Sequence, residues 1–495
     1  STVTSLRDLS REVRAAGPAA LQRLANKSAR GREAARVVSM VQDRLRDDWY
    51  DEADLLIAAT RAAAQLDATL GPVIAFLPRP EHGLATDLLA AVGARHALTV
   101  IVESTGIADV DAELEPFAAS LGAALDHSPV VARPATPPPG PDARPTATVL
   151  STTDSDDEVR HAVRIIVDAA REGTPFARMT VAWPVDRPYA RLVEHHLDAA
   201  GIPWNGRPGT LVAERLVPRF LLDLLDLDRR GLRRNDLFDF LADVPVRGPN
   251  GGRVSVARWE RLARAAGVAR DEHWQPRLAA LAAALRARDT PRLDDAGSAD
   301  ELAAFVAALR HDLGHRRRTR TWAAWADWCE QQVLRRLGTQ VLDQLDEAER
   351  LASDHAGKVL DRLRHLDAIS PPVNRFDFRT AFAAEFEVAP GRLGRLGNGV
   401  TIGSLAGTAG LDADLTIVLG AAEGLLPPPP TSDPLITDAD RAAAGLATAD
   451  ARRRRIHRSF LAHVNTTRHV VIGVPRGDLR ATSTRRPSRW IAEHD

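Results

Sequence analysis

Lysine is nearly absent from this chain, which limits the phosphate chemistry that its sequence can support. Only Lys27 and Lys358 occur, and the other 63 of the 65 basic residues are arginines. The phosphate-binding loop G-x-x-x-x-G-K-[ST] needs a lysine that reaches the terminal phosphates of a nucleotide. Lys27 lacks both glycines, and Lys358 lacks the first glycine and the hydroxyl residue that should follow it. The sequence therefore contains no complete nucleotide-binding loop, and we expect no cofactor in this chain.

Other reactive motifs are incomplete as well. A nuclease site of the D/E-x-K type needs a carboxylate two residues before the lysine, where this chain has Ala25 and Ala356. His311 and His315 have the spacing of helical metal ligands, but no carboxylate follows at the spacing of a known motif. Cys329 is the only cysteine, which excludes an internal disulfide and is typical of a reducing cytosol. We therefore predict no catalytic residue and no metal site.

Composition is that of a large globular protein. The chain has 495 residues, 44% of them hydrophobic, and a formal net charge of -1, so no global field draws it to nucleic acid. No apolar run reaches the ~18–20 residues that cross a bilayer, so we expect a cytoplasmic protein without membrane contact. The chain begins at Ser1 and has no methionine before Met40, so we expect a fragment of a longer protein.

The elements that must position any functional residues follow from short apolar runs and helical periodicities. Helical spacing of leucines covers residues 1 to about 70. We predict strands over 72–78, 97–103, 147–151, 179–184, 399–405, 415–420 and 469–474, and helices over 84–92, 156–171, 189–200 and throughout 211–387. A proline-rich stretch over 133–145 reads as an extended linker. This order favours one parallel α/β domain that is interrupted by a large helical insertion.

The first segment with a family pattern covers 154–225. There a helix of the form E-x-E/V-x-x-h-a-x-x-I precedes a strand, and the next helix ends in G-I-P-(Y/W). The residues that fit are Glu158, Val159, Ile165, Arg191, Glu194, Leu197, Gly201, Ile202, Pro203 and Trp204. This segment resembles the second motor domain of superfamily 1 helicases, specifically the B-type subunits of bacterial helicase–nuclease complexes that process DNA ends.

A second segment, GVTIGSLAGTAGLDADLTIVLGAAEGLLP over 399–427, is similar to motif V and its surroundings in the same family. The residues that fit are Gly410, Leu411, Asp412, Asp414, Gly420, Glu423, Gly424 and Pro427. The terminal stretch RRPSRWIAE also resembles the segment that follows the motor in these subunits. Together the two segments cover about a quarter of the chain, in the order that the family has.

The departures from the family pattern all remove polar or charged groups of the motor. Val185 stands at the motif IV arginine, Ala406 and Ala409 replace the histidine and lysine of motif V, and Asn465 aligns with the motif VI arginine. That arginine stabilises charge on the transferred phosphoryl group, and asparagine cannot supply a cation. The resemblance therefore implies a motor fold without ATP chemistry, as in degenerate B-type subunits.

The resemblance also implies a domain organisation. Residues 1–132 would be the C-terminal part of a first helicase-like α/β domain, followed by the linker over 133–146. A second, RecA-like domain would comprise 147–225 and 388–495, interrupted by an all-helical, 2B-like insertion over 226–387. The parent protein would act in DNA repair and recombination as an ATP-dependent helicase and hydrolase subunit. ATP and magnesium, and a nuclease domain of the PD-(D/E)XK family, would belong to that parent.

By this resemblance the chain would bind single-stranded or double-stranded DNA ends, track single strands, and dock onto the motor subunit of a heterodimeric complex. The candidate DNA-binding residues are Ser404, Gly407, Thr408, Gly410, Asp412 and Arg191. Small residues allow phosphates to approach the backbone, and hydroxyls donate to phosphate oxygens. The alternative is a protein–protein scaffold that retains the motor fold without touching DNA, and a helical protein of unrelated function is the third possibility.

Arginine and tryptophan clusters have two interpretations each. The run 452–455 with Arg458, and the run 316–318 with Arg320, could contact phosphates, but solvated helix faces in an arginine-biased protein are commoner. Trp322, Trp325 and Trp328 recur every three residues, and this stripe favours a packed core over base stacking.

We predict that this chain alone neither hydrolyses ATP nor cuts DNA, because the phosphate-binding loop, the D/E-x-K motif and the motor arginines are missing. Purified chain mixed with single-stranded DNA, ATP and magnesium should give no phosphate release and no DNA cleavage above a protein-free blank. DNA-stimulated ATPase that comigrates with the chain on a sizing column would contradict this prediction.

Overall fold

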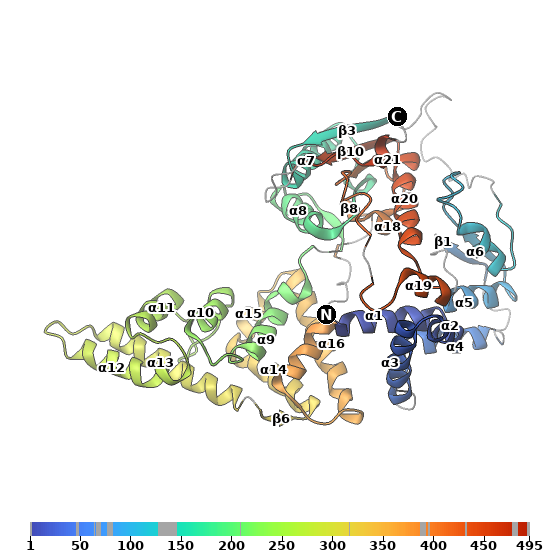
Figure 1. Cartoon of the computed structure of the whole chain (residues 1–495). Coiled ribbons are helices and arrows are strands. Elements are labelled where there is room, and N and C mark those ends of the chain that lie inside the picture. The colour runs from blue at the N-terminus through green and yellow to red at the C-terminus, as the bar shows by residue number, and fades with distance from the viewer. Residues whose placement is uncertain are drawn as a thin grey trace. The chain divides into compact units, whose positions relative to one another are not determined.

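The computed structural model divides into two compact units (Figure 1). The first unit comprises residues 1–209 and 392–495, and the second comprises 210–391. The structure describes residues 2–45, 49–63, 65, 71–76, 83–126, 146–207, 209–315, 317–386, 393–394, 397–430, 433–477 and 484–492. The linker predicted over 133–145 lies outside these residues.

The N-terminal part of the first unit is mostly helical. Its elements are α1 (Thr2–Ala15), α2 (Pro18–Lys27), α3 (Ala29–Leu45), α4 (Glu52–Ala63), β1 (Val73–Phe76), α5 (Leu84–Gly93), β2 (Leu98–Ile101) and α6 (Leu114–Ser120). Strands β1 and β2 pair in parallel with α5 between them along the chain, so the strand–helix–strand unit predicted over 72–103 is confirmed. Helices α1, α2 and α3 share a small core with α19 (Asp438–Ala444), in which Leu24 and Ala444 are fully buried.

A six-stranded, all-parallel sheet forms the centre of the first unit. Its strands are β3 (Thr146–Thr152), β4 (Met179–Trp183), β5 (Trp204–Gly206), β8 (Val400–Ser404), β9 (Leu415–Val418) and β10 (His469–Pro475). They lie in the order β3-β10-β9-β4-β8-β5. The prediction that the strands near Val149, Val181, Val400, Ile417 and Val471 share one parallel sheet is confirmed. The three-residue strand β5 was not predicted.

Helices cover both faces of this sheet, as parallel sheets require. On one face, α7 (Ser155–Arg171) and α8 (Asp186–Ala199) pack against Met179, Val181 and Trp183 of β4. On the other face, α18 (Leu405–Thr408), α20 (Ala449–Thr466) and α21 (Arg489–Ala492) pack around Ala182 of the same strand. Successive residues of a strand point to opposite faces, so β4 contributes to both cores.

The second unit is helical apart from a short antiparallel pair, β6 (Thr319–Arg320) with β7 (Val373–Asn374). Its helices are α9 (Leu216–Asp226), α10 (Arg234–Asp243), α11 (Val256–Ala265), α12 (Trp274–Arg286), α13 (Leu293–Leu313), α14 (Trp322–Arg336), α15 (Thr339–Asp343), α16 (Glu347–Arg364) and α17 (Arg375–Glu385). Helix α9, which we expected to belong with the first part of the α/β domain, packs within this helical unit. The chain leaves the sheet after β5 and returns to it at β8.

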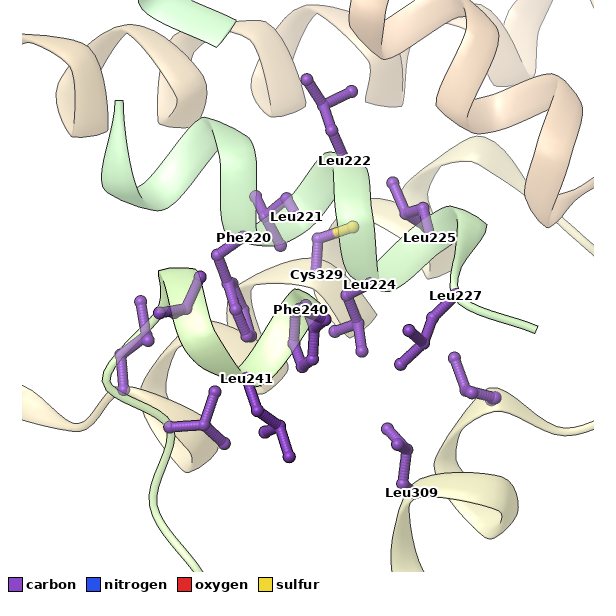
Figure 2. Packing of buried hydrophobic residues seen from close by; sticks show 14 of the residues in the cluster. Phe220, Leu221, Leu222, Leu224, Leu225, Leu227, Phe240, Leu241, Leu309 and Cys329 are labelled. Atoms are coloured by element: carbon purple, nitrogen blue, oxygen red, sulfur yellow. The ribbon is translucent and has the colours of Figure 1, made fainter. Parts of the chain in front are cut away.

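One large apolar core holds the helical unit together. Figure 2 shows Phe220, Leu221 and Leu224 of α9 close to Phe240 of α10 and Cys329 of α14. The predicted tryptophan stripe is confirmed as core, because all three of its rings are buried. The cysteine is also fully buried, as expected of a small apolar residue. Phe378 of α17 has no exposed surface and lies 5.8 Å from the Trp322 ring.

We expect Phe378→Ala to destabilise the helical unit by about 3–5 kcal/mol, because it removes a fully buried ring and leaves a cavity. Urea unfolding followed by tryptophan fluorescence measures the change. The control is Leu334→Ala on α14, whose side chain is 57% exposed and should change the free energy of unfolding by less than about 0.5 kcal/mol. Equal effects of the two substitutions would contradict this account of the core.

Candidate functional site

The exposed turn that follows β8 lies at the carboxyl edge of the sheet, where ligands of parallel α/β folds bind. Ser404, the last residue of β8, lies opposite Trp183, the last residue of β4. The Ser404 Oγ accepts a hydrogen bond from the Gly407 N–H at 3.2 Å and so caps α18. Because this hydroxyl acts as an acceptor in the cap, its own hydrogen stays available for donation. Ser404, Ala406 and Gly407 are exposed, so a phosphate can reach the backbone here.

Thr408 does not share this exposed surface. Its side chain is buried, and its Oγ1 donates a hydrogen bond to the Ser404 carbonyl at 2.9 Å. The same Oγ1 lies 3.2 Å from Nε2 of His463, a buried residue of α20. The Thr408 hydroxyl is therefore committed to the turn itself, and in this structure no phosphate can reach it.

Asp412 lies at the opposite, amino edge of the sheet. Its carboxylate accepts hydrogen bonds from Arg178 at 2.5 and 3.0 Å, and Arg178 directly precedes β4. Arg178 also donates to Asp414, which directly precedes β9, and this ion pair lowers the pKa of the Asp414 carboxyl. The segment from Ser404 to Asp412 thus crosses the sheet from one edge to the other. Its two ends cannot contribute to one site.

Gly410 and Arg191 are exposed, but they differ in their setting. Gly410 has a φ of 72°, in the left-handed region that favours glycine. Arg191 lies on α8, the helix that follows β4, and its guanidinium makes no ion pair with any residue that the structure describes. Arg191 is therefore available to bind an anion. Gly410 is exposed too, but it also allows the left-handed backbone conformation of this turn.

A buried carboxylate at the same edge was not predicted as a site. Glu158 lies in the first turn of α7 with no exposed surface. It accepts a hydrogen bond from the Tyr189 hydroxyl at 2.6 Å and another from the Gly420 N–H at 2.8 Å. A Cβ on Gly473 would overlap its carboxylate, and a Cβ on Gly420 would lie 2.7 Å from the Tyr189 ring. Burial raises the pKa of Glu158 to about 7.

Glu158 and Gly420 both fit the family pattern in the sequence, but the sequence did not predict that they contact each other. Tyr189 was missed, because a buried tyrosine hydroxyl usually has a hydrogen-bond partner but the sequence does not indicate which one. The hydrogen bond from Gly420 joins the two segments that resemble the helicase family, across 262 positions of sequence. The arrangement joins α7 to α8 and to the turn that follows β9, which is a structural role.

The arginines of α20 bind acidic residues of the same unit. Arg455 donates to Glu113 at 3.1 Å, and Arg458 donates to the Val110 carbonyl at 2.6 Å and lies 3.7 Å from Asp111. Arg458 is buried, and desolvation lowers the pKa of its guanidinium. These two arginines are therefore neither phosphate contacts nor part of a solvated face. They attach the segment around α6 to the sheet.

The second arginine cluster and the histidine pair lie in the helical unit. Arg320 lies over the Trp325 ring, 4.7 Å from its centroid, and burial lowers the pKa of its guanidinium. His315 and Arg317 line a cavity of about 510 Å³, together with Asp228, Asp271, Arg310 and Gly314. Arg316 lies outside the described residues. Among the residues that are described, no group of three or more His, Cys, Asp or Glu side chains could hold a metal ion.

In the described part of the chain, no helix combines the length and apolar character that a bilayer crossing needs. Comparison with known proteins adds no assignment. No protein-family model matches the chain, and no curated protein matches its sequence.

The raised pKa of Glu158 predicts a pH-dependent stability. Between about 4.5, its ordinary value, and about 7, the folded protein holds a proton on this carboxyl that the unfolded chain has lost. The contribution of Glu158 to stability therefore falls as the pH rises through this range, by on the order of 3 kcal/mol. Glu158→Gln cannot ionise, so it should flatten the decline in the free energy of unfolding measured between pH 4.5 and 7.5.

The matched control is Glu172→Gln, at the exposed C-terminal end of the same helix. It should keep the pH dependence of the unsubstituted chain. An unchanged slope in a folded Glu158→Gln variant would show that the carboxyl ionises normally.

Proposed function

We propose that this chain is part of a B-type subunit of a helicase–nuclease complex that processes DNA ends. In this proposal it contributes a degenerate RecA-like motor fold that binds single-stranded DNA and docks onto a partner motor subunit. The helical unit then corresponds to the insertion of the second motor domain, and residues before the linker to the end of the first. ATP, magnesium and nuclease activity belong to the parent complex.

The observation that carries this proposal is the hydrogen bond from the Gly420 N–H to Glu158. Both residues fit the family pattern, and they come from segments that lie on either side of the helical unit along the chain. A second link, from Arg178 to Asp414, joins the start of β4 to the start of β9. Chance matches in two unrelated segments have no reason to meet in one six-stranded parallel sheet.

The DNA contact is placed at the exposed part of the carboxyl edge. Ser404 supplies a hydroxyl donor, and Ala406 and Gly407 leave the backbone open to a phosphate. Arg191 supplies a cation on the helix that follows the neighbouring strand β4. These contacts are sequence-neutral, as suits a protein that tracks a single strand.

The scaffold alternative also has an observation in its favour. Arg455 and Arg458, which could have faced phosphates, hold acidic residues of the same unit instead. In addition, the family's histidine and lysine of motif V are alanines here. A chain that docks partners without binding DNA would have these properties, so the decisive experiment is DNA binding itself.

The test is fluorescence anisotropy with a labelled oligonucleotide over a series of salt concentrations. Phosphate contacts release counterions, so the affinity for single-stranded DNA should fall steeply as salt rises. Ala406→Glu and Ala406→Gln form a matched pair, because they add the same bulk to an exposed position and differ only in charge. We expect the Glu variant to bind at least about fivefold more weakly than the Gln variant at low salt, with a smaller difference at high salt.

Ala406 is preferred to Gly410 for this test, because any side chain at a φ of 72° adds backbone strain to the effect of charge. Both variants should show the circular dichroism of the unsubstituted chain. Absence of binding by the unsubstituted chain at low salt would favour the scaffold. Equal affinities of the two variants in a chain that does bind would contradict the DNA contact at this turn.

A further inference from the structure

The exposed turn Ser404–Thr408 is hydrogen-bonded to α20 through a buried imidazole, beside the apolar contact of Leu405 with the core that holds Phe460 and Leu461. The Nε2 atom of His463 lies 3.0 Å from the Leu405 carbonyl oxygen and 3.2 Å from the Thr408 Oγ1. A carbonyl oxygen only accepts hydrogen bonds, so Nε2 must carry a hydrogen. Burial lowers the pKa of His463, which keeps the ring neutral near pH 7. The single Nε2–H hydrogen is therefore shared between the two oxygens of the turn, in a three-centre hydrogen bond.

The hydrogen bonds within the turn continue from this donor. Thr408 Oγ1, which accepts from His463, donates its own hydrogen to the Ser404 carbonyl. In a separate hydrogen bond of the same turn, the Ser404 hydroxyl accepts from the Gly407 N–H. The connected hydrogen bonds therefore run from the buried imidazole through the Thr408 hydroxyl to the Ser404 carbonyl. Loss of the imidazole would leave a buried carbonyl and a buried hydroxyl without their donor, which is costly.

Helix α20 gives His463 a fixed position. Phe460 and Leu461, in the same helical turn, are buried in the core between α20 and the sheet. Nearer its N-terminal end, Arg455 and Arg458 bind the segment around α6. The helix is thus held along most of its length by groups that do not belong to the turn. Residues 404–408, by contrast, are exposed at three of five positions.

We propose that His463 is a positioning residue for the DNA-binding turn. It acts by holding the Leu405 carbonyl and the Thr408 hydroxyl, so that Ser404 and Gly407 face outward in one conformation. This proposal rests on the proposed function for its DNA readout, but the positioning itself can be measured without DNA. No motif matched in the sequence includes His463, which lies two residues before the position aligned with the motif VI arginine.

The test compares His463→Phe with His463→Gln. Phenylalanine fills a similar space without a donor, whereas the amide nitrogen of glutamine can reach the place of Nε2 and donate. Hydrogen–deuterium exchange is measured on peptides that cover 404–410 in the absence of DNA, with β4 as the internal reference. We expect exchange in the turn to rise about tenfold in the Phe variant and to stay near that of the unsubstituted chain in the Gln variant.

Single-stranded DNA affinity is measured on the same proteins by anisotropy. It should fall at least about fivefold in the Phe variant and be largely restored in the Gln variant. Asn465→Ala, at an exposed position of the same helix, serves as the control and should change neither readout. If the Phe variant does not fold, Thr408→Val replaces it, because valine keeps the shape of threonine and removes the hydroxyl. It should loosen the turn in the same way.

Unchanged exchange of 404–410 in a folded Phe or Val variant would overturn the proposal. So would equal loosening in the Phe and Gln variants, since the shape of the ring and not its hydrogen bond would then hold the turn. If the unsubstituted chain binds no DNA while the Phe variant still loosens the turn, His463 positions the turn and the proposed DNA function fails.

Discussion

The pairing of β4 with β8 on one side and with β9 on the other is the constraint on which the first unit depends. Both partners come from the chain beyond the helical unit, so the sheet exists only when the two stretches of the first unit meet. Strand β4 then lies in the interior of the sheet, and all five of its residues are buried. The turn after Ser404 and the network around Glu158 both take their places from this pairing.

Arginines join distant segments throughout this unit. Arg178 binds two aspartates that precede β9, Arg455 binds Glu113, and the buried Arg441 binds Asp433 and Glu12. A guanidinium is suited to such work because it offers several donors in a fixed plane and stays charged when partly buried. Arginines that are paired with carboxylates inside the unit contribute little to the electrostatic potential outside the protein. DNA binding at the carboxyl edge would therefore depend on neutral donors and a few exposed arginines, in keeping with the balanced net charge.

Short apolar runs were sufficient to predict five of the six strands and their parallel pairing, because strands buried on both faces leave a clear signal. Strand β5 escaped because Asn205 and Gly206 have little strand preference in so short a segment. The candidate site was harder to predict, because its contacts join residues that are far apart in the sequence. The hydroxyl of Thr408 contacts His463, 55 positions away, and Arg455 binds Glu113, 342 positions away. Asp412 was grouped with Ser404 by proximity in sequence, whereas the crossover takes it to the other edge.

The place of the helical unit in the chain also sets the order in which the protein can fold during synthesis. Strand β4 leaves the ribosome roughly 200 residues before β8, which at ~5–20 residues per second is on the order of 10–40 s. Through that interval both hydrogen-bonding edges of an apolar strand have no native partner, and such edges template aggregation. The core of the helical unit is also completed late, because Arg379 of α17 donates to the Leu222 carbonyl of α9 across 157 positions, and Arg375 binds Asp228 across 147. The nascent chain therefore carries both an incomplete sheet and an incomplete helical core until α17 emerges shortly before β8, and chaperone demand should be greatest in that period.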